Sequence, residues 1–194
     1  MNATISKQDL IPLPTYRPRR DEYITKMIAY KKNRRIKLAD HLSILFENKQ
    51  TVLFQIQELI NSEDLTDTGE IDEYISIYSS MLPDTNELSG TLFIEMDNQT
   101  LLEELLAKLK GIEHHLSLVV GSESIPAQFE EVHDDREFTT SVHYLKFSLT
   151  QSAVDYLKNS NIAHELKLVL SHPNLPAEVS LSAEQIKSLT EDLK

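Results

Sequence analysis

The stretch GTLFIEMDNQTLLEELLAKLKG, residues 90–111, joins two different hydrophobic patterns and decides the fold class. In its first half, Leu92, Ile94 and Met96 alternate with other residues, so they share one face of a β-strand. Phe93 lies on the opposite face, and we therefore expect this strand to be covered on both sides. The second half repeats its leucines at helical spacing. A strand followed directly by a helix predicts a fold that mixes the two.

Residues within and after this stretch indicate where helices end and where further strands lie. Thr100 and Glu103 fit a capping box for a helix over 101–109, and Gly111 is placed to end it. Further patterns predict strands at 114–120, 125–130, 141–149, 164–171 and 177–181, a helix at 152–159, and a final helix capped by Ser182 and Gln185.

The residues before position 90 are richer in helical patterns. The prolines predict an extended segment over 11–18, and a helix then follows with Tyr23, Ile24, Met27 and Ile28 on one face. The patterns of the next segments predict a hairpin of strands 34–38 and 41–46 around Ala39 and Asp40, a helix at 48–62, and a helix at 70–82 that ends before Pro83.

Together these patterns predict the α+β class, with a mostly antiparallel or mixed sheet packed with helices. The N-terminal half is expected to be helix-rich. A chain of 194 residues falls within the usual size of one domain. We therefore predict a single domain over 1–194, helix-rich over about 1–88 and strand-rich over about 89–194.

Composition excludes several classes of function. The chain has no cysteine, which excludes disulfides, thiolate nucleophiles, iron–sulfur ligation and thiolate zinc sites. Neither GxGxxG nor GxxxxGK[ST] occurs, so the common nucleotide-binding loops are absent. Apolar runs are far shorter than the roughly 20 residues that cross a bilayer, and the N-terminus does not resemble a secretory signal. We predict a cytoplasmic protein that does not enter the membrane.

Charge is unevenly distributed along the chain. The formal net charge is −12, yet residues 17–37 hold nine basic and two acidic residues, a local +7, which leaves −19 for the remainder. The basic segment could bind phosphate, with Tyr23 and Tyr30 available to stack on bases. The alternative, which the acidic remainder favours, is that this segment complements an acidic surface within the protein or between subunits. Nucleic acid is therefore not the expected partner.

The helix predicted at 48–62 carries the main candidate site. Thr51, Gln55, Glu58 and Ser62 form one narrow polar stripe, whereas apolar side chains occupy most of the remaining circumference. Polar groups on so apolar a helix need partners. We expect the stripe to face inward or into a cleft, with Glu47 or Glu58 paired to an arginine of the preceding hairpin. The candidate ligand-binding residues are Arg34, Arg35, Glu47, Asn48, Thr51, Gln55 and Glu58.

Two interpretations of this cluster remain open. One is an internal network of hydrogen bonds and ion pairs that fixes the hairpin to the helix. The other is a polar pocket for a small anion or a carboxylate ligand, because the planar guanidinium of arginine binds such groups through two parallel hydrogen bonds.

Weaker candidates exist for a metal site. The acidic segment from Glu130 to Glu137 places His133 and Asp135 among carboxylates, which suits a divalent ion, but its spacing matches no known metal-binding loop. His143 and His164 would approach each other if their strands were neighbours. Solvated loops and hydrogen-bonded core histidines are commoner outcomes, so we predict no metal and no cofactor.

The segments KKNRRIKL, LSILFENKQTVLFQIQEL, YSSMLP, LSGTLFIE, HPNLP and LTEDL resemble an uncharacterised bacterial family that carries a domain of unknown function. The similarity extends over nearly the whole chain. Departures from the family pattern occur at Ala39, Ser79 and Leu175, which puts any role of those positions in doubt. The family pattern is matched at Arg34, Arg35, Phe46, Glu47, Asn48, Thr51, Gln55, Gln57, Glu58, Tyr78, Pro83, Thr91, His172, Pro173 and Asp192.

The resemblance implies genes that lie beside those of rubrerythrin and an iron–sulfur oxidoreductase, and hence a role in peroxide defence or electron-transfer metabolism. It implies no known activity. Two functional hypotheses follow. The first is a non-catalytic accessory or interaction protein, which binds a protein partner or forms a homo-oligomer. The second is a small-anion-binding protein or enzyme that uses the Arg/Glu cluster.

Overall fold

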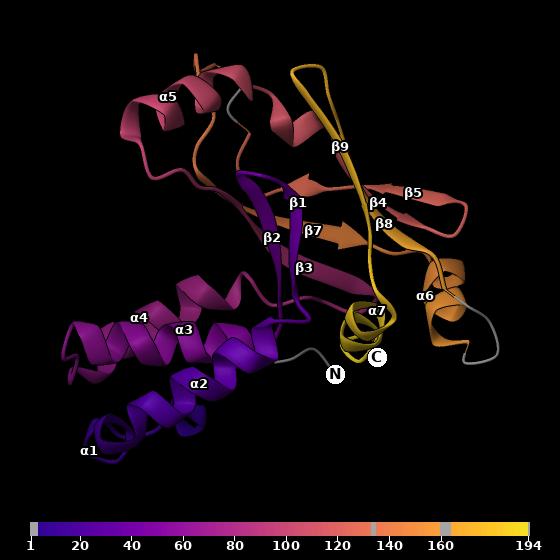
Figure 1. Ribbon diagram of the computed structural model, residues 1–194. Coiled ribbons are helices and arrows are strands. Elements are labelled where there is room, and N and C mark those ends of the chain that lie inside the picture. Colours follow the sequence, from indigo (N-terminus) through magenta and orange to yellow (C-terminus); the bar gives the residue numbers. More distant parts are fainter. Residues whose placement is uncertain (1–3, 133–134, 160–163, 194) are drawn as a thin grey trace.

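The computed structural model describes residues 4–132, 135–159 and 164–193 (Figure 1). The helices are α1 (Leu13–Tyr16), α2 (Arg20–Lys31), α3 (Lys49–Ser62), α4 (Thr68–Ser79), α5 (Gln99–Lys108), α6 (Gln151–Lys158) and α7 (Ala183–Thr190), with short 3-10 turns η1 (Lys7–Asp9), η2 (Arg17–Arg19) and η3 (Ile112–His114). The strands are β1 (Arg35–Ala39), β2 (Leu42–Glu47), β3 (Glu87–Ile94), β4 (Leu116–Val120), β5 (Glu123–Pro126), β6 (Gln128–Phe129), β7 (Val142–Ser148), β8 (Leu166–His172) and β9 (Leu175–Ser180).

The strands form two antiparallel sheets. One has the order β1-β2-β3-β7-β6 and the other the order β5-β4-β8-β9. In the first sheet, Thr91 of β3 lies opposite Leu45 of β2 and Tyr144 of β7. This register matters for the site, because these residues and Glu47 lie on the face opposite to Phe46, which points into the core.

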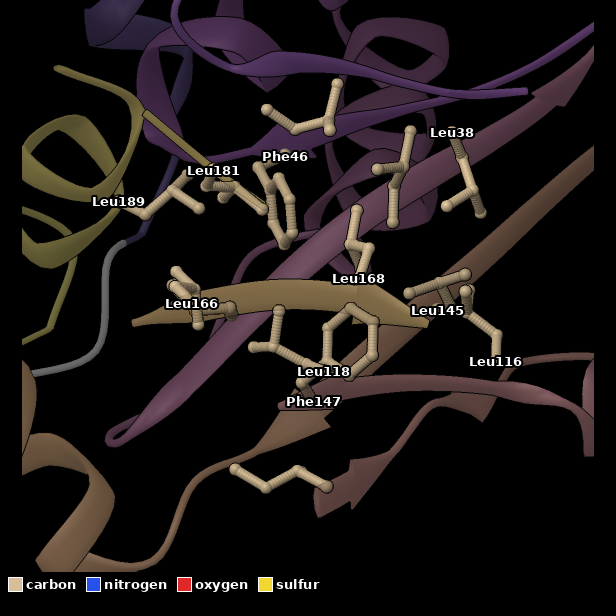
Figure 2. Close-up of a cluster of buried hydrophobic side chains, with 14 of the residues drawn as sticks. Leu38, Phe46, Leu116, Leu118, Leu145, Phe147, Leu166, Leu168, Leu181 and Leu189 are labelled. Atoms are coloured by element: carbon tan, nitrogen blue, oxygen red, sulfur yellow. The ribbon is translucent and has the colours of Figure 1, made fainter. Parts of the chain in front are cut away.

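The main core lies between the two sheets, as Figure 2 shows for Phe46 and Phe147 from one sheet and Leu118 and Leu168 from the other. All four side chains are fully buried, and the two phenylalanine rings are 6.1 Å apart. Strict alternation of buried and less buried residues along β7 and β8 produces this arrangement, since successive side chains point to opposite faces.

A second apolar cluster holds the N-terminal helices together. Val52, Ile56 and Ile60 of α3 are buried with Ile75 of α4. Gln57, also on α3, accepts a hydrogen bond from the Ile11 amide at 2.8 Å and donates one to the Ile11 carbonyl at 3.1 Å. The side chain of one glutamine therefore ties the N-terminal segment to the helical cluster. No helix in the described ranges is long and apolar enough to cross a membrane.

The predicted α+β class and the helix-rich N-terminal region are confirmed, and so are the hairpin and the capping box of Ser182 and Gln185. The extended segment predicted over 11–18 is wrong, because α1 and η2 occupy most of it. Pro14 and Pro18 stand in the first turns of these helices, where a missing amide donor costs nothing.

The cap predicted for the helix after β3 is also wrong. Asn98 caps α5 by accepting a hydrogen bond from the Leu101 amide at 3.0 Å, and Thr100 lies inside the helix. Asparagine is among the best N-cap residues, so it competes well against the threonine two positions later. Gly111 adopts a left-handed conformation with φ of +81°, but it lies two residues beyond Leu109, the C-cap of α5, and is the N-cap of η3.

Candidate functional site

Arg34 forms the centre of the predicted cluster and is a buried internal residue. It donates hydrogen bonds to the carbonyl oxygens of Phe46 at 2.9 Å and Ser188 at 3.0 Å, and it forms an ion pair with Asp192. The Arg34 side chain is 1% exposed and that of Asp192 is 9% exposed. This guanidinium joins β2 to the residues around the C-terminal helix α7, and its planar fork is occupied by groups of the chain itself.

Asn48 extends this arrangement to α3. Its side-chain oxygen accepts hydrogen bonds from the amides of Gln50 and Thr51, which is the usual role of an N-cap. Its side-chain nitrogen donates to Asp192 at 2.8 Å and to the Tyr30 hydroxyl at 2.7 Å. We call Tyr30, Arg34, Asn48 and Asp192 the Arg34 cluster. It connects α2, the start of α3 and the C-terminal residues.

Glu58 has a different partner from the predicted one. Its carboxylate accepts hydrogen bonds from Arg20 at 2.9 and 2.6 Å and from the Tyr16 hydroxyl at 2.8 Å. Burial raises the pKa of Glu58, but the hydrogen bonds from Arg20 and Tyr16 and the charge of Arg20 lower it by more, so the pKa lies below its ordinary value. The expected pairing with Arg34 or Arg35 is therefore wrong, because α2 brings Arg20 alongside α3.

The remaining candidate residues, Thr51, Gln55 and Arg35, do not form one site. Thr51 is fully buried, and its hydroxyl forms hydrogen bonds with the backbone amide and carbonyl of Asn48 in the capping box. Gln55 is half-buried and makes no hydrogen bond within the described residues. Arg35 is exposed, lies 4.7 Å from the Phe93 ring centre, and has Glu95 at 3.5 Å. In the stripe itself, Thr51 belongs to a helix cap, Gln55 is a half-buried amide and Glu58 forms an ion pair with Arg20.

Glu47 is the one predicted residue with an unexplained atom. It is 3% exposed, and Oε1 accepts a hydrogen bond from the Thr91 hydroxyl at 3.0 Å. Oε2 is buried and has no hydrogen-bond partner in the part of the chain that the structure describes. A buried carboxylate oxygen without a donor is costly, so such an atom calls for a water, an ion or a ligand.

The half-buried Lys31 and the exposed Tyr144 share the electrostatic environment of Glu47. Burial lowers the pKa of the Lys31 ammonium, the charge of Glu47 raises it, and Arg35 lowers it again, for a net decrease. Burial raises the pKa of the Tyr144 hydroxyl, and Tyr78 and Glu47 add to that increase. A lysine and a tyrosine from different elements are therefore close enough to feel the Glu47 charge.

The metal candidates do not come together. His133 lies outside the described residues, and Asp135 is exposed. His143, on β7, contacts the Thr139 hydroxyl at 2.9 Å, whereas His164 precedes β8 in the other sheet and contacts the Asn159 carbonyl at 2.8 Å. No group of three or more potential metal ligands occurs among the residues that the structure describes.

The basic segment is largely neutralised within the chain. Six of its nine basic side chains form ion pairs in the described structure: Arg17 with Asp64, Arg19 with Glu22, Arg20 with Glu58, Arg34 with Asp192, Arg35 with Glu95 and Lys37 with Asp40. Most of the local positive charge therefore complements the acidic remainder of the same protein, as one of the two sequence interpretations expected.

Several partners in these networks have no local signal in the sequence. Arg20 and Tyr16 lie about 40 residues before Glu58, and hydrophobic periodicity does not predict which surfaces of two helices meet. Asp192 lies 158 residues after Arg34. The only sign of its importance was the family pattern, which includes Asp192, Arg34, Asn48 and Thr91.

Comparison with known proteins shows the family to which the chain belongs. A crystal structure of a novel protein of unknown function from Burkholderia pseudomallei matches 99% of this chain and 100% of its own chain, with a TM-score of 0.90 and 31% sequence identity. No curated protein matches. The profile of a protein family of unknown function, DUF3501, matches residues 4–193. The chain therefore belongs to the DUF3501 family.

Proposed function

We propose that this protein is a non-catalytic accessory protein that works while bound to another protein. The observation that carries this proposal is the enclosure of Arg34. Its guanidinium could have served as an anion site, but it is 1% exposed and bonds to Phe46, Ser188 and Asp192 of the same chain. Arg34 and Glu58 are thus committed to partners within the chain, so this proposal places the function at the surface.

An exposed apolar strip offers one place for a partner. Phe138 and Val142 are exposed, and so is Tyr144 two residues further along β7. Val142 lies opposite the half-exposed Phe93 in the sheet register. Exposed aromatic and aliphatic side chains that lie together commonly mark sites of protein–protein contact. The family resemblance supports a redox partner, in peroxide defence or electron-transfer metabolism.

Site-specific photo-crosslinking in bacterial cells that express this protein tests the proposal. A crosslinkable amino acid at Val142 should yield an adduct whose mass spectrum identifies a rubrerythrin-like or iron–sulfur protein. The same amino acid at Ser122, in the exposed turn between β4 and β5, serves as the control and should not. Equal adducts at both positions, or no adduct at Val142, would contradict a specific partner on this strip.

A second candidate function rests on Glu47. Its unpartnered Oε2 favours a small ligand that brings a hydrogen-bond donor or a positive charge, since an anion would be repelled. Thermal unfolding with and without a primary alkylamine salt tests this. Stabilisation of the wild type but not of Glu47→Gln, against sodium chloride at equal ionic strength, would support a donor-binding site. Identical shifts in both proteins would exclude it.

A further inference from the structure

Two helices of the N-terminal region expose large apolar side chains that the fold leaves uncovered. Ile28 on α2 is 68% exposed and Ile77 on α4 is 55% exposed. No residue of α2 is buried, although Ile28 was predicted to share one face with Tyr23, Ile24 and Met27. Both helices contact α3, and Figure 1 shows the three grouped together to one side of the sheets. Each of these two helices packs on α3 and presents an exposed isoleucine, which a helix of another molecule could cover.

The charges beside the two isoleucines are opposite in sign. Lys32 lies four residues after Ile28, and its backbone continues the helical conformation, so it shares the face of Ile28. Glu73 lies four residues before Ile77, so these two residues share one face of α4. Both charged side chains are exposed, and neither forms an ion pair among the described residues. Each helix thus presents one isoleucine and one uncompensated charge, one turn apart.

The order of these residues fits an antiparallel pairing. If α2 of one molecule lies antiparallel to α4 of another, with Ile28 opposite Ile77, then Lys32 lies opposite Glu73, because the two spacings are equal and run in opposite directions. The helix dipoles are also opposed in this arrangement. A parallel pairing with the same isoleucine contact would place Lys32 beyond the end of α4, far from Glu73.

We propose that this protein forms a two-fold symmetric dimer in which α2 of each copy packs against α4 of the other. Two-fold symmetry makes the same contact twice, so both isoleucines and both charges of each chain are used. The charges that are left unpaired agree with a second copy as the partner. Among the described residues, Lys26, Lys31 and Lys32 at α2 form no ion pair. On α4 the same holds for Glu70 and Glu73. The net unpaired charge is therefore positive on α2 and negative on α4.

Charge reversal in separate chains gives a sharp test by sedimentation velocity over a range of concentrations. The wild type should show a concentration-dependent dimer. Lys32→Glu and Glu73→Lys should each weaken dimerisation at least tenfold, because every contact then joins like charges. An equimolar mixture of the two variants should restore the dimer, since opposite charges then meet in both contacts. One contact joins the two introduced side chains, and the other joins the original Lys32 and Glu73.

The controls separate this contact from general effects of charge. Lys26→Glu makes the same change on the same helix, but position 26 lies on nearly the opposite side of α2 from Ile28, so it should leave dimerisation unchanged. Ile28→Asp should abolish the dimer while circular dichroism shows an intact fold. A wild type that stays monomeric at several hundred micromolar, a mixture that fails to restore the dimer, or an equal effect of Lys26→Glu would each overturn the proposal.

Discussion

The ion pair of Arg34 and Asp192 allows a quantitative prediction about stability. Replacement of Asp192 by alanine removes the charge partner of a guanidinium that is 1% exposed, and it also removes an acceptor for Asn48. Loss of one partner of a buried ion pair costs about 3–5 kcal/mol. Arg34 keeps the carbonyl oxygens of Phe46 and Ser188 as acceptors, so we expect the lower end, about 3 kcal/mol.

Urea unfolding at pH 7, followed by circular dichroism, measures this loss. The neighbouring arginine supplies the control, because Arg35 is exposed and its pair with Glu95 spans 3.5 Å, so Arg35→Ala should change the free energy of unfolding by less than about 0.5 kcal/mol. A double-mutant cycle with Arg34→Met and Asp192→Ala isolates the pair, with an expected coupling of about 2 kcal/mol. Additive losses, or a loss below about 1 kcal/mol for Asp192→Ala, would refute a buried ion pair at this position.

Three further predictions concern other contacts. Glu58→Gln should lower the free energy of unfolding at pH 7 by less than Asp192→Ala does. Because the pKa of Glu58 is lowered in the fold, the difference in free energy between Glu58→Gln and the wild type should shrink as the pH falls below about 4.5. Urea unfolding at several pH values measures it. Gln57→Ala should cost about 1–2 kcal/mol and accelerate hydrogen exchange of the Ile11 amide, as read by mass spectrometry. Gly90→Ala should destabilise the first sheet, because the new Cβ would lie 3.1 Å from Ile44 and 3.3 Å from the Leu45 carbonyl oxygen; a lower midpoint of thermal unfolding than that of the wild type checks this.

The sequence predicted elements better than it predicted contacts. Alternation along β7 and β8, and the helical pattern of α3, arise from burial on one face, so they can be read from local spacing. The error at α1 arose because proline, which predicts an extended segment, is also accepted in the first turn of a helix. At α5 two capping signals competed, and Asn98 caps the helix instead of Thr100. The polar cluster was located near the correct residues, but its partners depend on how α2 and the C-terminus pack, which spacing does not determine.

The sequence interpretation failed at Glu47 because the Arg34 guanidinium contacts other groups. Arg34 forms an ion pair with Asp192, whose carboxylate also accepts a hydrogen bond from Asn48. The contact of Arg34 with Glu47 is made to the backbone carbonyl oxygen, at 3.5 Å. Among the described residues, the Glu47 carboxylate is therefore left with Thr91 alone. The same commitment of Arg34 that stabilises the fold leaves Oε2 of Glu47 open to a donor from outside the chain.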